Sequence, residues 1–253
     1  MVEIRPNKIK HKLENGELAT VVQGELTPDL IEHFGPFGFD GVWIEAEHGP
    51  IDFADVRDMT RAADLWGMTS VARVNLNLPG VIYRTFDQGA QAVVVPHVNT
   101  AEEARAVVDA SKFHPIGSRG AYTSRHGIGV DRYMQKANDE TMAIILIEDI
   151  VAVNNLADIL TVDYIDVFFV APGDLAQSMG FPGEAARPEV QATVDDAIRQ
   201  IVAAGRVAGA LVNETNLERY LELDSRFIST NFQPWLETGA RAYLDTLAAL
   251  QRK

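Results

Sequence analysis

The chain has 253 residues, a formal net charge of −14 and no Cys, which excludes disulfides and leaves only oxygen or nitrogen ligands for any metal. The acidic balance argues against a nucleic-acid partner. The sequence shows neither an apolar run long enough for a bilayer nor a signal-peptide pattern. We therefore expect a cytoplasmic protein with no nucleic-acid or membrane partner.

Eight short apolar segments alternate with helical patterns along the chain. The predicted strands cover residues 18–22, 41–44, 70–72, 92–95, 142–147, 167–170, 207–212 and 227–229. A short surface helix at 7–15 comes first, and the other predicted helices cover residues 27–34, 53–66, 79–88, 101–112, 131–137, 152–160, 189–203, 216–223 and 236–250.

Eight strand–helix units predict one (β/α)8 TIM barrel over residues 1–253 with a short N-terminal helix. A doubly wound open sheet is the alternative, but no Gly-x-Gly-x-x-Gly follows the first strand.

A long irregular stretch, residues 113–130, interrupts the regular alternation. It carries four glycines together with Arg125 and His126. Long loops inside compact domains are usually functional or disordered, and we expect this one to face the substrate. Arg125 and His126 then either bind the acidic end of a substrate or are solvated loop residues.

Charged residues follow several predicted strands at the point where each strand ends. Glu47 and His48 follow the second strand, Arg73 the third, Glu148 the fifth and Asp174 the sixth. In a barrel these ends converge on one face. Glu148 and Asp174 would repel each other there unless a cation lay between them, and two carboxylates plus waters suit Mg²⁺ or Mn²⁺. The alternative is that each acid merely caps its own turn.

The sequence lacks the residues that two common catalytic mechanisms require, namely Schiff-base formation and Ser-His-Asp catalysis. None of the six lysines lies at a predicted strand end, so a Schiff-base mechanism has no candidate nucleophile. No Gly-x-Ser-x-Gly elbow is present for Ser-His-Asp chemistry.

Six segments in order resemble the HpcH/HpaI aldolase family, which comprises metal-dependent class II pyruvate aldolases. They are residues 43–50, 72–75, 86–89, 117–120, 145–148 and 169–175, and the similarity runs from about residue 38 to 190. The resemblance implies a barrel of the phosphoenolpyruvate/pyruvate type that uses Mg²⁺, Mn²⁺ or Co²⁺ and no organic cofactor. One departure is Glu45, where the family usually has Asp.

The resemblance also implies roles for individual residues. Glu148 and Asp174 match the metal ligands, and Arg73 matches the arginine that contacts the keto oxygen and steadies the enolate. Glu47 would orient metal-bound waters. Backbone N–H groups at the turn after the sixth strand would hold the substrate carboxylate, and this turn consists of Pro172, Gly173 and Asp174.

His48 with Asp87 matches the acid/base dyad of the family. Histidine suits a proton transfer because its charge changes near neutral pH, although His48 also reads as a structural histidine before Pro50. Asp87 is chosen on the resemblance alone, since an Asp in a predicted helix is otherwise a solvated residue.

The expected activity is therefore the reversible cleavage of a 4-hydroxy-2-oxo acid to pyruvate, or hydroxypyruvate, and an aldehyde. The alternatives are a lyase acting on a CoA thioester, which would need a basic site for the CoA phosphates, and a non-catalytic barrel that binds an oxo acid. By resemblance the protein is a homo-oligomer, a hexamer built from dimers. The last predicted helix, residues 236–250, is either exchanged between subunits or packed on its own barrel.

Overall fold

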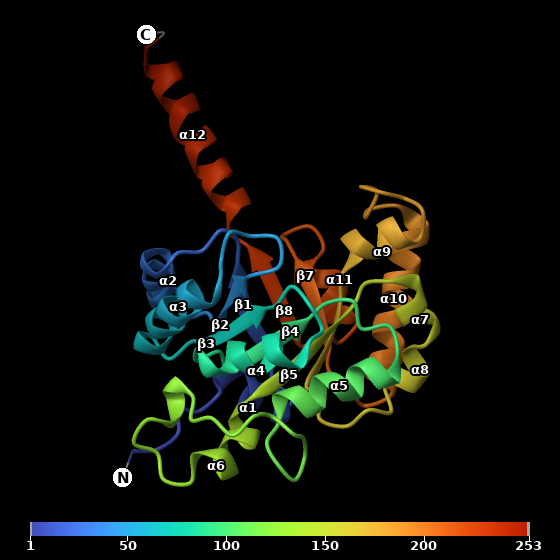
Figure 1. Cartoon of the computed structure of the whole chain (residues 1–253). Coiled ribbons are helices and arrows are strands. Elements are labelled where there is room, and N and C mark those ends of the chain that lie inside the picture. The colour runs from blue at the N-terminus through green and yellow to red at the C-terminus, as the bar shows by residue number, and fades with distance from the viewer. Residues whose placement is uncertain (1, 252–253) are drawn as a thin grey trace.

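The computed structural model describes residues 2–251 and shows a closed barrel of eight parallel strands (Figure 1). Each strand pairs with its neighbours in the chain, and β8 closes the barrel on β1. This confirms the predicted (β/α)8 fold. The strands are β1 Ala19–Gln23, β2 Gly41–Glu45, β3 Thr69–Arg73, β4 Ala92–Val95, β5 Met142–Ile147, β6 Val167–Val170, β7 Ala208–Val212 and β8 Phe227–Asn231.

Helices surround the barrel on the outside (Figure 1). They are α1 Lys8–Glu14, α2 Pro28–Phe34, α3 Phe53–Leu65, α4 Pro79–Asp87, α5 Ala101–Ser111, α6 Tyr133–Glu140, α7 Ile150–Asn154, α8 Leu156–Ile159, α9 Pro172–Ser178, α10 Pro188–Ala203, α11 Leu217–Glu222 and α12 Gln233–Gln251. Apart from shifts of a few residues at the ends of elements, two features differ from the prediction. The helix expected at 152–160 is the pair α7 and α8, and α9 was not predicted, because Pro172 and Gly173 read as a turn although proline also begins helices.

Apolar side chains form two layers. One fills the interior of the barrel, and the other lies between the barrel and the surrounding helices. Alternate strand residues such as Trp43, Leu146 and Phe169 form one cluster inside the barrel, as the two-residue period of a strand requires. Ile9 and Leu13 of α1 belong to this inner cluster, and the Ile9 N–H donates to Thr69 Oγ1 at the start of β3. Helix α1 therefore closes the amino-terminal end of the barrel, which leaves the carboxyl-terminal end for chemistry.

The stretch at 113–130 lies at the amino-terminal end of its own barrel. Together with α6 it connects α5 to β5, and every helix-to-strand connection of such a barrel returns to that end. Arg125 Nη2 lies 2.5 Å from Asp64 Oδ2, and His126 Nε2 lies 3.3 Å from the same oxygen. The expectation that this loop faces the substrate is thus wrong within one chain. Both side chains are largely buried around Asp64, so neither is a solvated loop residue.

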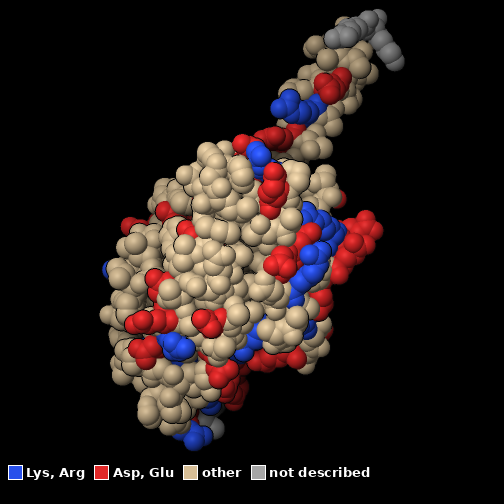
Figure 2. All heavy atoms as spheres, turned by 90° about the vertical axis from the view of Figure 1, so that its right-hand side faces the viewer, with Lys and Arg blue, Asp and Glu red and all other residues tan. Residues whose placement is uncertain are grey.

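Helix α12 extends away from the barrel (Figure 1). None of its residues is buried, and Leu236, Tyr243, Leu244, Leu247 and Leu250 are exposed. Its surface is mostly uncharged (Figure 2). The helix begins at Gln233, three residues before the predicted start. Trp235 in its first turn packs on the barrel, stacked on Phe39 and donating to Glu214, whereas the rest of the helix extends away. Across residues 2–251, no helix is long and apolar enough to cross a bilayer.

Candidate active site

The last residues of β2 and β3 form a charged pair at the carboxyl-terminal end of the barrel. Glu45 and Arg73 are register partners, and Arg73 Nε donates to Glu45 Oε2 at 2.7 Å. Glu45 Oε1 also accepts from the backbone N–H groups of Glu47 at 2.9 Å and His48 at 3.1 Å. Burial disfavours the Glu45 carboxylate, but Arg73 and these N–H groups outweigh it, so the pKa of Glu45 is lowered. Glu45 therefore stays ionised and fixes the loop that carries His48.

Arg73 reaches a second carboxylate, that of Glu47. Arg73 Nη1 lies 3.0 Å from Glu47 Oε2, and His48 Nε2 lies 3.9 Å from the same oxygen. Burial raises the pKa of Glu47, although Arg73 partly opposes this effect. Glu47 Oε2 is buried and accepts no hydrogen bond of good geometry from the described residues. The structure thus brings together Glu47, His48 and Arg73, as predicted, and leaves a carboxylate oxygen without a full partner.

Glu148 directly follows β5 and is 2% exposed. Burial raises its pKa, and the nearby carboxylates of Asp174 and Glu47 raise it further. Asp174 lies in the first turn of α9, just beyond β6, where it is exposed. The two acids therefore follow neighbouring strands at one end of the barrel, and their role as a pair of metal ligands stays a prediction.

His97 is a site residue that the sequence reasoning missed. Its backbone N–H donates to Glu148 Oε1 at 2.8 Å, and its ring atom Nδ1 lies 3.3 Å from the same oxygen. The ring atom Nε2 lies 3.6 Å from Glu47 Oε1, so His97 bridges the two acids. Its φ of 55° is in the left-handed region, which is uncommon for a non-glycine residue and often marks a functional site. The sequence did offer one signal for His97 as a site residue: like the other candidates, it directly follows a strand, β4, with only Pro96 between them.

The donor set fits a hard divalent cation. Within residues 2–251, no group of three or more His, Asp and Glu side chains has the arrangement of a complete metal site. Mg²⁺ and Mn²⁺ do not need one, since they bind through one or two carboxylates and keep several waters. Burial and acidic neighbours raise the pKa of Glu148, so a bound cation would stabilise its ionised form. Glu148 and Asp174 would hold such a cation.

The proposed substrate-carboxylate turn is accessible. Gly173 is exposed, and a Cβ built on it meets no atom within 4 Å, so the backbone of Pro172, Gly173 and Asp174 can be approached closely. The role of this turn stays a prediction.

Asp87 lies apart from His48 within one chain. It is the last residue of α4, at the amino-terminal end of the barrel, whereas His48 follows β2 at the other end. Arg119 Nη2 donates to Asp87 Oδ1 at 2.9 Å, and the Arg119 guanidinium lies against the rings of Phe86 and Phe113. Burial raises the pKa of Asp87, while Arg119 opposes this effect. The predicted His48–Asp87 dyad is therefore not assembled by a single chain.

The fold and this cluster define a barrel enzyme with carboxylates, an arginine and histidines at the carboxyl-terminal strand ends. Comparison with known proteins agrees: the model of the HpcH/HpaI aldolase/citrate lyase family matches residues 23–234. The chain belongs to this family and is a carbon–carbon lyase.

Individual relatives are similar over most of their length. A 4-hydroxy-2-oxo-heptane-1,7-dioate aldolase of Salmonella heidelberg is 40% identical, over 81% of this chain and 80% of that protein. A hydroxypyruvate/pyruvate aldolase of Cupriavidus necator is 36% identical, over 85% and 81%. Among solved structures, an HpcH/HpaI aldolase/citrate lyase family protein of Burkholderia cenocepacia has a TM-score of 0.89 at 27% identity, covering 96% of this chain and 99% of that one.

Proposed function

We propose that this chain catalyses the reversible aldol cleavage of a 4-hydroxy-2-oxo acid to pyruvate, or hydroxypyruvate, and an aldehyde. The observation that carries the proposal is the buried carboxylate of Glu148, at the same end of the barrel as Asp174 and the Arg73 guanidinium. The names of the relatives from Salmonella heidelberg and Cupriavidus necator support this substrate class.

Cleavage breaks the bond between C3 and C4 of the substrate and leaves an electron pair that becomes an enolate. A divalent cation, Mg²⁺, Mn²⁺ or Co²⁺, would supply Lewis-acid stabilisation when bound by Glu148 and Asp174. Arg73 is held by Glu45 and Glu47, so its guanidinium is oriented before negative charge develops on the keto oxygen.

His48 is the candidate for the proton of the 4-hydroxyl group. Its side chain is 67% exposed and its loop is fixed by Glu45, so the ring can meet a substrate that enters from solvent. Glu47 lies next to His48 and Arg73, where its Oε2, which accepts no hydrogen bond of good geometry from the described residues, can orient water. In cleavage the proton passes from the hydroxyl to His48, and the enolate later accepts a proton at C3.

We also propose a homo-oligomer, with a hexamer of α12-exchanged dimers as its form. The support is the exposed apolar surface of α12, which its own barrel does not cover. Asp87 keeps its predicted acid/base role only as a proposal, since one chain does not bring it to His48.

The deciding experiment is the exchange of pyruvate methyl protons in D₂O, followed by NMR. We expect exchange with Mg²⁺ or Mn²⁺ that stops on addition of EDTA and is lost in Glu148→Gln. Glu222→Gln, the same change on the exposed face of α11, is the matched control and should exchange normally. Absence of exchange in protein that demonstrably binds the cation would rule out pyruvate as the donor, and full exchange in Glu148→Gln would remove Glu148 from the mechanism.

A further inference from the structure

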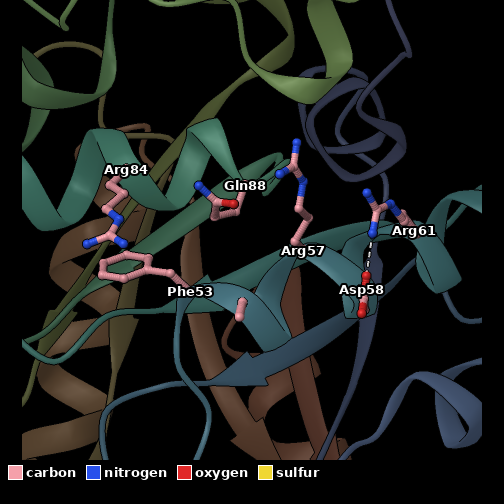
Figure 3. Close-up of a pocket in the computed structure, with 7 residues that line it drawn as sticks. Phe53, Arg57, Asp58, Arg61, Arg84 and Gln88 are labelled. Carbon is pink, nitrogen blue, oxygen red and sulfur yellow. Dashed lines mark hydrogen bonds and ion pairs between the residues drawn. The ribbon is translucent and has the colours of Figure 1, made fainter.

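Three arginines line a pocket between α3 and α4, on the outside of the barrel (Figure 3). The pocket has a volume of about 460 Å³. Arg57 and Arg61 come from α3, one helical turn apart, and Arg84 comes from α4. The wall is completed by Phe53, Asp58 and Gln88.

Two of these arginines are held in place by neighbours in the pocket. The Arg84 guanidinium lies over the ring of Phe53, 4.1 Å from its centroid. Arg61 forms an ion pair with Asp58, which is the one acid lining the pocket. Stacking and pairing restrict these long side chains, so less conformational entropy is lost when an anion binds between them.

The positive charge of the pocket is not neutralised by the protein. Among the described residues, neither Arg57 nor Arg84 has a carboxylate within ion-pair distance, in a chain whose net charge is −14. Three guanidinium groups face one carboxylate here. All three side chains are exposed, so their guanidinium groups are open to an anion from solvent.

The pocket is separate from the charged residues at the strand ends but borders their loops; this strand-end cluster consists of Glu45, Glu47, His48, Arg73, His97, Glu148 and Asp174. Phe53 also lines a second cavity of about 130 Å³, together with Ala46 and Asn75. Ala46 precedes Glu47, and Asn75 follows Arg73 by two residues. A ligand in the arginine pocket would therefore lie behind the loops of the candidate active site rather than among its reacting groups.

We propose that the α3–α4 pocket binds a phosphate group, with Arg57, Arg61 and Arg84 as its ligands. Arginine forks match phosphate oxygens in pairs, and a phosphate carries more charge than a single carboxylate. The group comes either as free inorganic phosphate or as part of a larger molecule such as CoA, whose phosphates require a basic site of this kind. The inference is independent of the aldol reaction, because none of these residues belongs to the strand-end cluster.

Titration calorimetry at constant ionic strength tests the proposal with three probes: inorganic phosphate, CoA and succinate. We expect saturable binding of phosphate or CoA, and weaker binding of the dicarboxylate succinate. Each of Arg57→Gln and Arg84→Gln should weaken binding by about 10-fold or more, as the loss of a charge-assisted hydrogen bond predicts. CoA binding far tighter than phosphate binding would identify the larger molecule as the source.

Two control variants separate a built site from general positive charge. Arg105→Gln removes an exposed arginine of α5 outside the pocket and should leave binding unchanged. Arg84→Lys keeps the charge but loses the stacked fork, and should weaken binding nearly as much as Arg84→Gln. The proposal is overturned if neither phosphate nor CoA binds saturably. It is equally overturned if Arg57→Gln and Arg84→Gln leave binding intact, which would place the anion elsewhere, or if Arg105→Gln weakens binding as much as they do.

Discussion

Replacing Lys112 with methionine should stabilise the barrel near pH 7. Lys112 directly follows α5 as its C-cap residue and is 1% exposed. Its Nζ donates to the backbone carbonyls of Asn138 at 3.0 Å and Thr141 at 2.5 Å. Lys10 Nζ donates to the same two carbonyls, each at 3.2 Å, so both oxygens keep a donor in the variant. Methionine has a similar length and carries no charge to bury.

The magnitude follows from the pKa of the buried amine. Burial lowers the pKa of Lys112 from 10.5 to about 8, and the positive charge of Lys10 lowers it further, while Asp166 opposes both. A difference of this size corresponds to about 3 kcal/mol of unfavourable free energy for the charged form at neutral pH. Part of that gain is offset by the hydrogen bonds that Lys112 itself makes. We expect a net increase of about 1–2 kcal/mol in the free energy of unfolding.

The lowered pKa of Lys112 also predicts how the free energy of unfolding changes with pH. The folded pKa of about 8 lies below the unfolded value of 10.5, so the unfolded chain binds the proton more tightly. The wild type should therefore gain stability as pH rises from about 8 to 10.5, and the variant should lack this gain. Lys10→Met is the matched control: it removes the other donor and the ion pair with Asp166, and should destabilise the protein at pH 7.

Urea unfolding at pH 7 and pH 10 measures both quantities. A Lys112→Met variant that is less stable than wild type at pH 7 would show that the hydrogen bonds outweigh the cost of burying the charge. Parallel pH dependence in the two proteins would show that Lys112 does not release its proton in the folded state. Either result refutes the reasoning.

Three further predictions concern the candidate site and α12. Arg73→Lys should lower kcat by about 10²–10³-fold, because an ammonium group cannot contact Glu45 and Glu47 while facing the keto oxygen; unchanged kcat would contradict this. His97→Asn keeps a residue that tolerates the left-handed backbone but removes the ring beside Glu148. It should weaken Mn²⁺ binding about 10-fold in an EPR titration, and unchanged affinity would show that the ring does not support the cation. Removal of residues 236–253, which keeps Trp235 on the barrel, should leave the thermal transition in place but give a smaller species in sedimentation, and an unchanged sedimentation coefficient would exclude α12 from assembly.

The strand ends could be predicted because buried parallel strands have their own sequence pattern. Apolar runs mark β5 and β6, and the first acids beyond them, Glu148 and Asp174, fall on one face of a barrel. His97 was missed for a physical reason. Its residue type does not reveal a left-handed backbone, and that conformation is what directs its N–H to Glu148.

Chain direction, rather than composition, decides the place of a loop. The glycines and basic residues of 113–130 suggested a substrate loop, but a helix-to-strand connection reaches the end of the barrel that α1 closes. The arginine pocket lay beyond sequence reasoning in another way. Helical spacing places Arg57 and Arg61 on one face of α3, but only the packing of α4 against α3 brings Arg84 to them.

Closure of the barrel has a consequence for biosynthesis. The pairing of β8 with β1 joins strands from opposite ends of the chain, and β2 to β7 are all made before β8. Until then β1 presents an open edge whose backbone groups can pair with another nascent chain. In the interval between the synthesis of β1 and that of β8 the nascent chain is therefore exposed to aggregation through this edge, and slower translation should lengthen that interval.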